Sequence, residues 1–124
     1  MKICNILPDT LLNSTTVTTL VFMPMVYSVL LSFFQEFKFA MLFAPFMSVC
    51  SKHAHYYDEK EKGSVQIPTL FVIGENDQVI VPVRSEALLP FFSKPQVIKH
   101  EGGHFVPATS KQKQAYLSFL DDQK

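Results

Sequence analysis

Residues 68–77 read PTLFVIGEND and residues 96–107 read QVIKHEGGHFVP. The first stretch begins with an apolar strand-like run and the second with a shorter strand-like run that ends at Lys99. Each continues into glycine and polar residues typical of a turn. Between them, residues 83–92 have the composition of a short helix that places leucine and phenylalanine side chains inward. The order strand, helix, strand predicts two parallel strands joined by a right-handed crossover. The sequence therefore indicates an α/β fold.

Further elements extend this pattern in both directions. Residues 37–44 (FKFAMLFA) are apolar on both faces and predict a third buried strand. Residues 48–63 are polar and predict a loop that ends in a solvated charged run. Residues 107–122 carry apolar side chains at helical spacing and predict a final helix. Strands and helices thus alternate after residue 37.

We expect the three strands, at residues 37–44, 68–73 and 96–100, to be mutually parallel with 68–73 in the middle. The outer side of the 37–44 strand then lacks a neighbour. An unpaired apolar edge promotes association with other chains. The sequence therefore predicts self-association through an open sheet edge.

The amino-terminal region contains the longest uncharged stretch of the chain. Residues 17–34 (VTTLVFMPMVYSVLLSFF) carry no charge and are long enough to span a membrane. Pro24 would kink such a helix, and no basic cluster flanks it. A signal peptide is poorly supported, because the stretch has one preceding lysine and no cleavage-site pattern. We favour a buried apolar helix from Pro24 or Met25 to Gln35, with a membrane segment over residues 17–34 as the alternative.

Composition limits the classes of function. The chain has 124 residues, enough for one domain, with 11 basic and 11 acidic residues and a formal charge of zero. This balance argues against a nucleic-acid partner. Cys4 and Cys50 do not have metal-ligand spacing and are expected to be reduced thiols of a cytoplasmic protein. His53 and His55 could share a metal, but no third ligand lies near them, so we predict no metal and no cofactor.

Asp77 and His104 are the candidate site residues. Each follows the end of a predicted strand, and His104 comes after Gly102 and Gly103, which permit a sharp turn free of side chains. The carboxyl ends of parallel strands meet at one sheet edge, so we expect Asp77 and His104 to lie within hydrogen-bonding distance. In an acyl-transfer triad, an acid fixes the imidazole tautomer and the histidine moves the proton. The alternatives are a turn-forming aspartate and a surface histidine.

A nucleophile is harder to identify. None of the four glycines frames a G-x-S-x-G elbow. The substitute nucleophiles are Ser28, Ser32, Ser48, Ser51, Ser85 and Cys50, of which Cys50 is expected to be a small buried side chain and Ser85 a helix-starting residue. The alternative acids are Glu75 and Glu101, and Glu75 is expected to face solvent. His100 is expected to end its strand as a packed or surface residue.

Five segments carry a specific family resemblance over about two thirds of the chain. The matching residues are Phe37-Lys38-Phe39-Ala40, Ile67-Pro68-Thr69-Leu70, Gly74-x-x-Asp77-x-Val79-Ile80, His100-x-Gly102-Gly103-His104-Phe105-Val106-Pro107 and Gln112-x-Gln114-Ala115-Tyr116-Leu117-x-Phe119-Leu120-Asp121. The chain resembles the carboxyl-terminal half of the ovarian-cancer-associated serine hydrolases, the small FSH-type α/β-hydrolases. The resemblance implies carboxylesterase-like chemistry on a small-molecule ester, with Asp77 as triad acid and His104 as triad base. The chain departs from the family in its proline after the acid, which falls one position later at Pro82, and in residues 1–36, where no family motif is recognised.

These observations predict an α/β protein with a partial α/β-hydrolase fold: three parallel strands with crossover helices, preceded by an apolar helix. Residues 1–36 form the unmatched amino-terminal segment and residues 37–124 the hydrolase part. The acid and base are present, but the nucleophile elbow and the oxyanion loop are missing. We therefore expect a truncated, inactive or incomplete serine hydrolase, which leaves open whether the chain is itself an enzyme. The alternatives are a non-catalytic interaction module and a membrane-anchored fragment.

Overall fold

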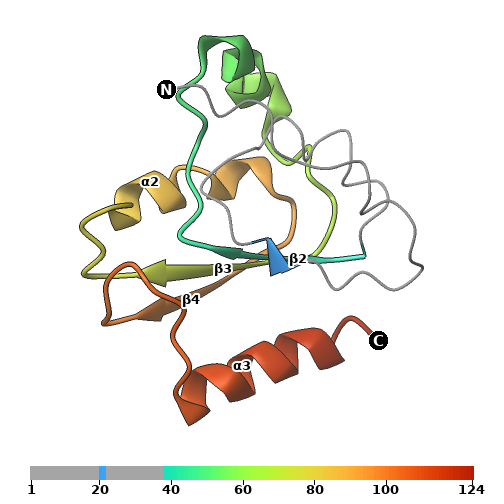
Figure 1. Cartoon of the computed structure of the whole chain (residues 1–124). Coiled ribbons are helices and arrows are strands. Elements are labelled where there is room, and N and C mark those ends of the chain that lie inside the picture. The colour runs from blue at the N-terminus through green and yellow to red at the C-terminus, as the bar shows by residue number, and fades with distance from the viewer. Residues whose placement is uncertain (1–19, 22–37) are drawn as a thin grey trace, which may run out of the picture.

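A computed structural model describes residues 20–21 and 38–124 of the chain (Figure 1). The strands are β1 (Leu20–Val21), β2 (Ala40–Phe43), β3 (Thr69–Gly74) and β4 (Pro95–His100). The α-helices are α2 (Pro82–Glu86) and α3 (Ser110–Asp121), and the 3-10 helices are η3 (Ser51–Tyr57), η4 (Glu59–Glu61) and η5 (Leu89–Phe91). In this part of the chain the strands form one parallel sheet in the order β1-β2-β3-β4.

The three predicted strands are confirmed as parallel neighbours, with β3 between β2 and β4. The prediction that the outer side of residues 37–44 lacks a neighbour is wrong. Leu20–Val21 pairs there in parallel with Met41 and Leu42 of β2. A strand of two residues is too short to produce a recognisable sequence pattern, which explains the error.

The same two residues limit the interpretation of the uncharged stretch at 17–34. Leu20–Val21 is a strand, which precedes the predicted start of the apolar helix at Pro24 or Met25. The helix predicted to end at Gln35 lies outside the described residues. Among the residues that are described, no helix is long and apolar enough to cross a membrane.

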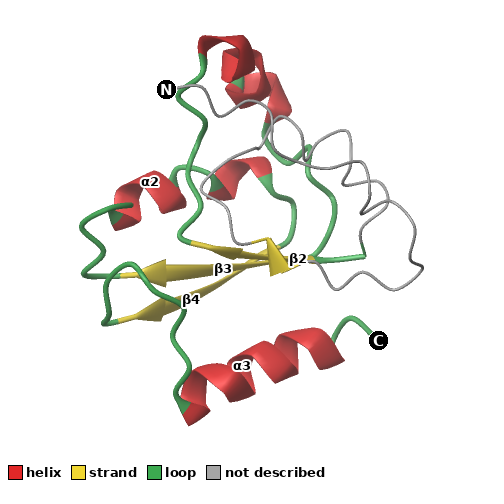
Figure 2. Cartoon of the chain, in the orientation of Figure 1, coloured by secondary structure: helices red, strands yellow, loops and turns green. Residues whose placement is uncertain are grey.

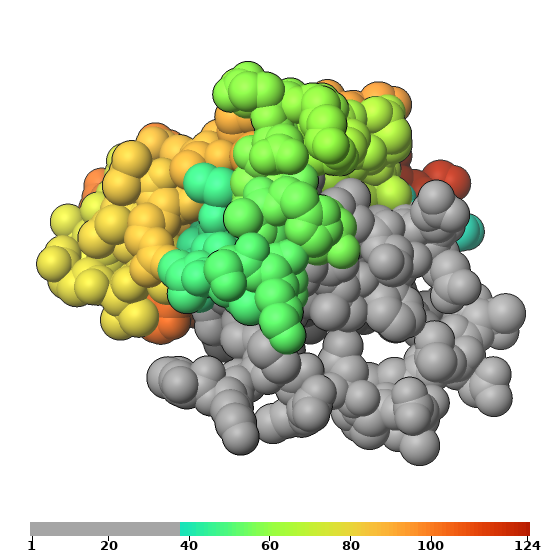
Figure 3. All heavy atoms as spheres, turned by 90° about the horizontal axis from the view of Figure 1, so that it is seen from above, coloured from blue at the N-terminus to red at the C-terminus, as the bar shows by residue number. Residues whose placement is uncertain are grey.

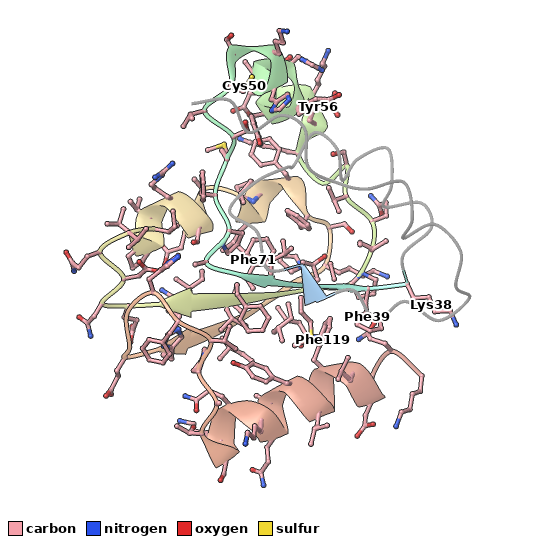
Figure 4. All side chains as sticks on the ribbon, in the orientation of Figure 1. Lys38, Phe39, Cys50, Tyr56, Phe71 and Phe119 are labelled. Carbon is pink, nitrogen blue, oxygen red and sulfur yellow. The ribbon has the colours of Figure 1, made fainter. Side chains whose placement is uncertain are left out.

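The sheet is covered on both faces (Figure 2). On one face lie α2 and the 3-10 helices, packed on a cluster of buried residues: Ala40, Leu42, Val65, Phe71, Ile73, Leu88, Phe91 and Phe92. On the other face lies α3, packed on a second cluster: Met41, Leu70, Val72 and Phe119. Successive β3 side chains therefore alternate between two apolar layers, which is why its sequence is an unbroken apolar run. Figure 4 shows Phe71 and Phe119 on opposite sides of the sheet.

The helix α3 is held to the sheet by one fully buried side chain. Phe119 is 2% exposed and meets Phe39 edge to face, with ring centroids 5.9 Å apart. Tyr116 and Leu120, three residues before and one after it, pack partly against the same cluster. Leu117 faces away and is 59% exposed.

Two predicted segments differ from the structure. The helix expected at 83–92 is divided into α2 and η5, since Pro90 lacks an N–H and its ring would clash with the carbonyl of Glu86, where α2 ends. The loop expected at 48–63 contains η3 and η4. The green segment that carries η3 lies beside the yellow and orange segment of α2 (Figure 3). Arg84 joins the two, with Cζ 4.4 Å from the ring centroid of Phe46.

Candidate functional site

Asp77 lies in the turn that follows β3. Its backbone N–H donates to the carbonyl of Gly74 across 3.2 Å, which closes the turn. Its Oδ1 accepts hydrogen bonds from the N–H groups of Val79 and Ile80, both at 2.8 Å. The residue is 1% exposed. The backbone around Asp77 therefore fixes the position of a buried carboxylate.

His104 meets this carboxylate from the loop that follows β4. Its Nδ1 lies 2.9 Å from Oδ2 of Asp77, which confirms the predicted hydrogen bond between the two residues. Because an ionised carboxylate only accepts, Nδ1 carries the shared proton and Nε2 of the neutral ring is the basic nitrogen. The His104 side chain is 40% exposed, and no described residue is hydrogen-bonded to its Nε2. The pair thus offers a base on an imidazole ring that is partly exposed.

The surroundings of Asp77 favour its charged form. Burial raises the pKa of its carboxyl group, but the hydrogen bonds from His104, Ile80 and Val79 and the charge of a protonated His104 lower it. The net result is an Asp77 pKa below the ordinary value. Asp77 is therefore ionised at neutral pH and can stabilise a protonated imidazole.

Hydrogen bonds join the loop after β3 to the loop after β4. The N–H of Glu75 donates to the carbonyl of His100 across 2.8 Å, and the N–H of Asn76 donates to the carbonyl of Gly102 across 3.2 Å. The Asn76 side chain adds a third bond, from Nδ2 to the carbonyl of Glu101 at 2.5 Å. The separation of acid and histidine is thus set by backbone groups of both loops.

Two glycines allow these loops to approach each other. A Cβ on Gly74 would lie 2.6 Å from the carbonyl oxygen of Gly103 and 2.8 Å from that of Gly102. A Cβ on Gly102 would run into the ring of Phe105. Neither Gly102 nor Gly103 has a positive φ, so the expected sharp glycine turn is not what requires them. At Gly74 and Gly102 glycine is needed for close contact, whereas a Cβ on Gly103 would lie at an ordinary contact distance, 3.7 Å, from the carbonyl oxygen of Asn76.

The other candidate acids and the neighbouring histidine lie apart from the pair. Glu75 and Glu101 are exposed, and neither is hydrogen-bonded to His104. His100 is buried, with 6% of its surface exposed, and its Nδ1 accepts a hydrogen bond from the N–H of Gly102. Within the described residues, Asp77 is thus the acid that His104 contacts.

The described substitute nucleophiles do not contact His104 either. Ser48 Oγ lies 2.8 Å from Nδ1 of His53 and accepts from the N–H of Cys50 across 3.2 Å. Cys50 is partly exposed and lies in the segment far above the sheet in Figure 4, so the expected burial is wrong. Ser85 is fully buried inside α2, and its hydroxyl has no hydrogen-bond partner among the described residues. Ser28 and Ser32 lie outside the described residues.

The described residues contain no metal cluster, and the cavity next to the pair is not lined by either of its side chains. Residues 20–21 and 38–124 have no group of three or more metal-ligating side chains. A cavity of about 410 Å³ opens between the end of β4 and the start of α3. Its lining includes His100, Phe105, Thr109 and Gln112 but neither Asp77 nor His104. The hydrogen bond from a partly exposed imidazole to a buried carboxylate is an arrangement that can transfer protons.

Comparison with known proteins gives one family. The family model described as serine hydrolase (FSH1) matches residues 15–116. Esterase OVCA2 of Danio rerio is 46% identical over 85 residues, which are 68% of this chain and 36% of that protein. Esterase OVCA2 of Xenopus tropicalis is 42% identical over 86 residues, which are 69% of this chain and 36% of that protein.

A mammalian relative aligns over a shorter region. Esterase OVCA2 of Bos taurus is 43% identical over 60 residues, covering 48% of this chain and 26% of that protein. The chain spans about a third of the length of the two relatives with the longer matches. No solved structure matches it.

Proposed function

Because this chain belongs to the FSH1 serine hydrolase family, we propose that Asp77 and His104 are the acid and the base of a carboxylic ester hydrolase. The observation that carries the proposal is the 2.9 Å hydrogen bond from Nδ1 of the partly exposed His104 ring to Oδ2 of the buried Asp77. The acid precedes the histidine in the chain, which is the order of α/β-hydrolases. We assign the parallel sheet to a partial α/β-hydrolase fold on the same grounds.

In this mechanism His104 transfers protons and Asp77 stays ionised. Nε2 of His104 takes the proton of a serine hydroxyl as its oxygen bonds to the ester carbonyl carbon. The same nitrogen then gives that proton to the leaving alcohol, whose bond to the carbonyl carbon breaks. A water molecule then attacks the acyl carbonyl carbon while Nε2 of His104 takes its proton. The bond from that carbon to the serine oxygen breaks, the serine regains a proton from Nε2, and the carboxylic acid product is released. Asp77 holds the Nδ1–H tautomer and stabilises the imidazolium that forms in both steps.

The mechanism also needs a serine and oxyanion donors. Within residues 38–124, neither Ser48 nor Ser85 is hydrogen-bonded to His104. The 124-residue sequence also contains no G-x-S-x-G motif. We propose that the serine and the oxyanion donors come from sequence that the longer relatives have and this chain does not span. On this proposal the chain alone holds the acid–base half of the machinery and does not hydrolyse esters.

Apolar side chains flank the pair. Val79 follows Asp77 by two residues and is 62% exposed, and Phe105 follows His104 directly and is 58% exposed. Exposed apolar side chains beside a polar pair are typical of ligand-binding surfaces. They support a small-molecule ester whose carbon groups contact this surface.

The test is covalent labelling with a serine-directed fluorophosphonate. We expect no labelling of the 124-residue chain. A chimaera that joins the amino-terminal part of the Danio rerio relative to residues 38–124 should label at one serine. His104→Ala should abolish this labelling, and Asp77→Asn should slow it by about 10⁴-fold, the loss typical of a triad aspartate. His53→Ala is the matched control and should label at the rate of the parent.

Two outcomes would contradict the proposal. One is a folded chimaera that carries the elbow serine and does not label. The other is labelling of the 124-residue chain at one serine, lost in His104→Ala. That result would place the nucleophile within this sequence, at a residue such as Ser28, Ser32 or Ser48.

An interaction module is the second candidate function. The observation that favours it is the position of β1, a strand of two residues that is the outermost described strand on its side of the sheet. A strand from a second copy could add at this edge by backbone hydrogen bonds. Sedimentation velocity over a hundredfold range of concentration tests it. A monodisperse monomer throughout that range would exclude self-association through this edge.

A further inference from the structure

His100 is a second histidine beside the pair and has no role in the proton transfers above. It is the last residue of β4, and its backbone lies opposite Gly74 in the register with β3. It is 94% buried, since 6% of its surface is exposed. A buried polar ring costs free energy unless its nitrogens have partners, so its contacts indicate its role.

The ring of His100 contacts the residues on both sides of His104. Its Nδ1 accepts a hydrogen bond from the N–H of Gly102 across 3.2 Å. Its ring lies 5.3 Å from the ring of Phe105, centroid to centroid, with 60° between the planes. Gly102 sits between these two rings, and a Cβ there would be 2.9 Å from Nδ1 of His100. His104 is therefore held in a loop whose other residues are packed on His100.

We propose that His100 is a positioning residue, which holds the 102–105 loop from the sheet side so that Nδ1 of His104 stays on Oδ2 of Asp77. The inference rests on the proposed function of His104 and Asp77 as base and acid. Asn76 holds the same loop through the carbonyls of Glu101 and Gly102. The loop thus has contacts with both His100 and Asn76, and within the described residues the His104 side chain is hydrogen-bonded to Asp77 alone.

This role requires the neutral ring. Only an unprotonated Nδ1 can accept from the N–H of Gly102, so the proton of the neutral ring is on Nε2. Burial lowers the pKa of His100, and the charges of Asp77 and Glu75 oppose this only in part. Other charged groups line the cavity beside the ring: Lys99, Glu101 and Lys111. The net lowering keeps His100 in the form that the Gly102 bond needs.

Two variants of His100 distinguish the loss of its hydrogen-bond acceptor from a change in the size of its side chain. His100→Asn keeps an acceptor, Oδ1, near the place of Nδ1. His100→Leu has the same branching and no acceptor. The readout is the Nδ1–H proton resonance of His104 in the 124-residue chain, assigned by its absence in His104→Gln and in Asp77→Asn. Its exchange rate with solvent reports how often the Asp77 bond opens.

We expect the exchange in His100→Leu to be at least tenfold faster than in the parent, or the resonance to be lost, whereas His100→Asn stays within threefold of the parent. The inference is overturned if His100→Leu keeps the parental rate, or if Asn and Leu change it equally. If His100→Leu does not fold, His100→Gln replaces it, because its amide reaches the place of Nε2 and misses that of Nδ1. Parental exchange in His100→Gln would then overturn the inference.

The readout does not depend on ester hydrolysis. An unlabelled chimaera would contradict the proposed function and leave the exchange rates of the His100 variants as they are. Equal exchange in the Asn and Leu variants would contradict the positioning role and leave the labelling of the chimaera as it is. The two failures are therefore distinguishable.

Discussion

Replacing Asp77 should destabilise the fold more than replacing His104, although the two share one hydrogen bond. Asp77 is 1% exposed, and its carboxylate accepts from three donors, of which His104 is one and two are backbone N–H groups of Val79 and Ile80. Asp77→Ala removes all three bonds and leaves the two backbone donors without an acceptor. His104→Ala removes one bond and leaves the carboxylate with its two backbone donors.

The magnitudes follow from this count. A hydrogen bond to a charged group contributes about 1.5–3 kcal/mol, and part of this is offset by the relief of burying a carboxylate, so we expect Asp77→Ala to lower the free energy of unfolding by about 3–4 kcal/mol. The 40% exposure of the His104 ring weakens its bond, so His104→Ala should cost about 1 kcal/mol. Asp77→Asn keeps Oδ1 as an acceptor for both N–H groups and should cost about 1–2 kcal/mol.

Urea unfolding at constant slope measures these differences. The pKa of Asp77 is lowered in the folded chain. Its stabilisation is therefore complete above the unfolded pKa of about 3.9 and is lost as the pH falls through the folded pKa. The difference in the free energy of unfolding between the parent and Asp77→Asn should become smaller on acidification. The reasoning is refuted if Asp77→Ala lowers the free energy of unfolding at pH 7 by no more than His104→Ala does. It is also refuted if the difference between the parent and Asp77→Asn stays constant down to pH 3.

Three further predictions concern stability, each measured by the urea midpoint. Ser85→Ala should be neutral or stabilise the fold by up to about 1–3 kcal/mol, since the buried Ser85 hydroxyl has no described partner. A clear loss of stability would mean that the hydroxyl has a hydrogen-bond partner. Gly74→Ala should cost about 1–3 kcal/mol through its contacts with the opposite loop, whereas Gly103→Ala should be neutral or gain up to about 1 kcal/mol; equal effects would contradict the close approach. Phe119→Ala should cost about 3–5 kcal/mol and the exposed Leu117→Ala less than about 0.5 kcal/mol; similar costs would mean that α3 packs differently.

The sequence predicts the central sheet well because burial on both faces leaves a direct trace in composition. Leu70 and Val72 face α3, while Phe71 and Ile73 face α2 and η5, so all four had to be apolar. The strand β1 leaves no such trace, since two residues are too few to show a hydrophobic periodicity. The end of α2 could have been predicted from Pro90, whose clash with the carbonyl four residues earlier places the boundary at Glu86.

The pair itself was predictable because the two strands end in register. Gly74 lies opposite His100, so residues a few positions beyond each reach the same place at the sheet edge. The loop-to-loop hydrogen bonds were not predictable, because their acceptors are backbone carbonyls, which every residue has. Asn76 looks like an ordinary turn former until the carbonyl of Glu101 is placed beside its amide.

The two sequence-based interpretations of Asp77 are not alternatives in the structure. As a turn former, an aspartate uses its side chain to accept from the backbone just ahead, and Oδ1 of Asp77 does so with Val79 and Ile80. As a partner of a histidine it needs an oxygen that the turn leaves free, and Oδ2 meets His104. A carboxylate has two oxygens, so the turn fixes the orientation of the one that the histidine binds. The turn motif is thus what makes Asp77 a rigid partner for the imidazole, and a short turn former such as serine could not serve both contacts.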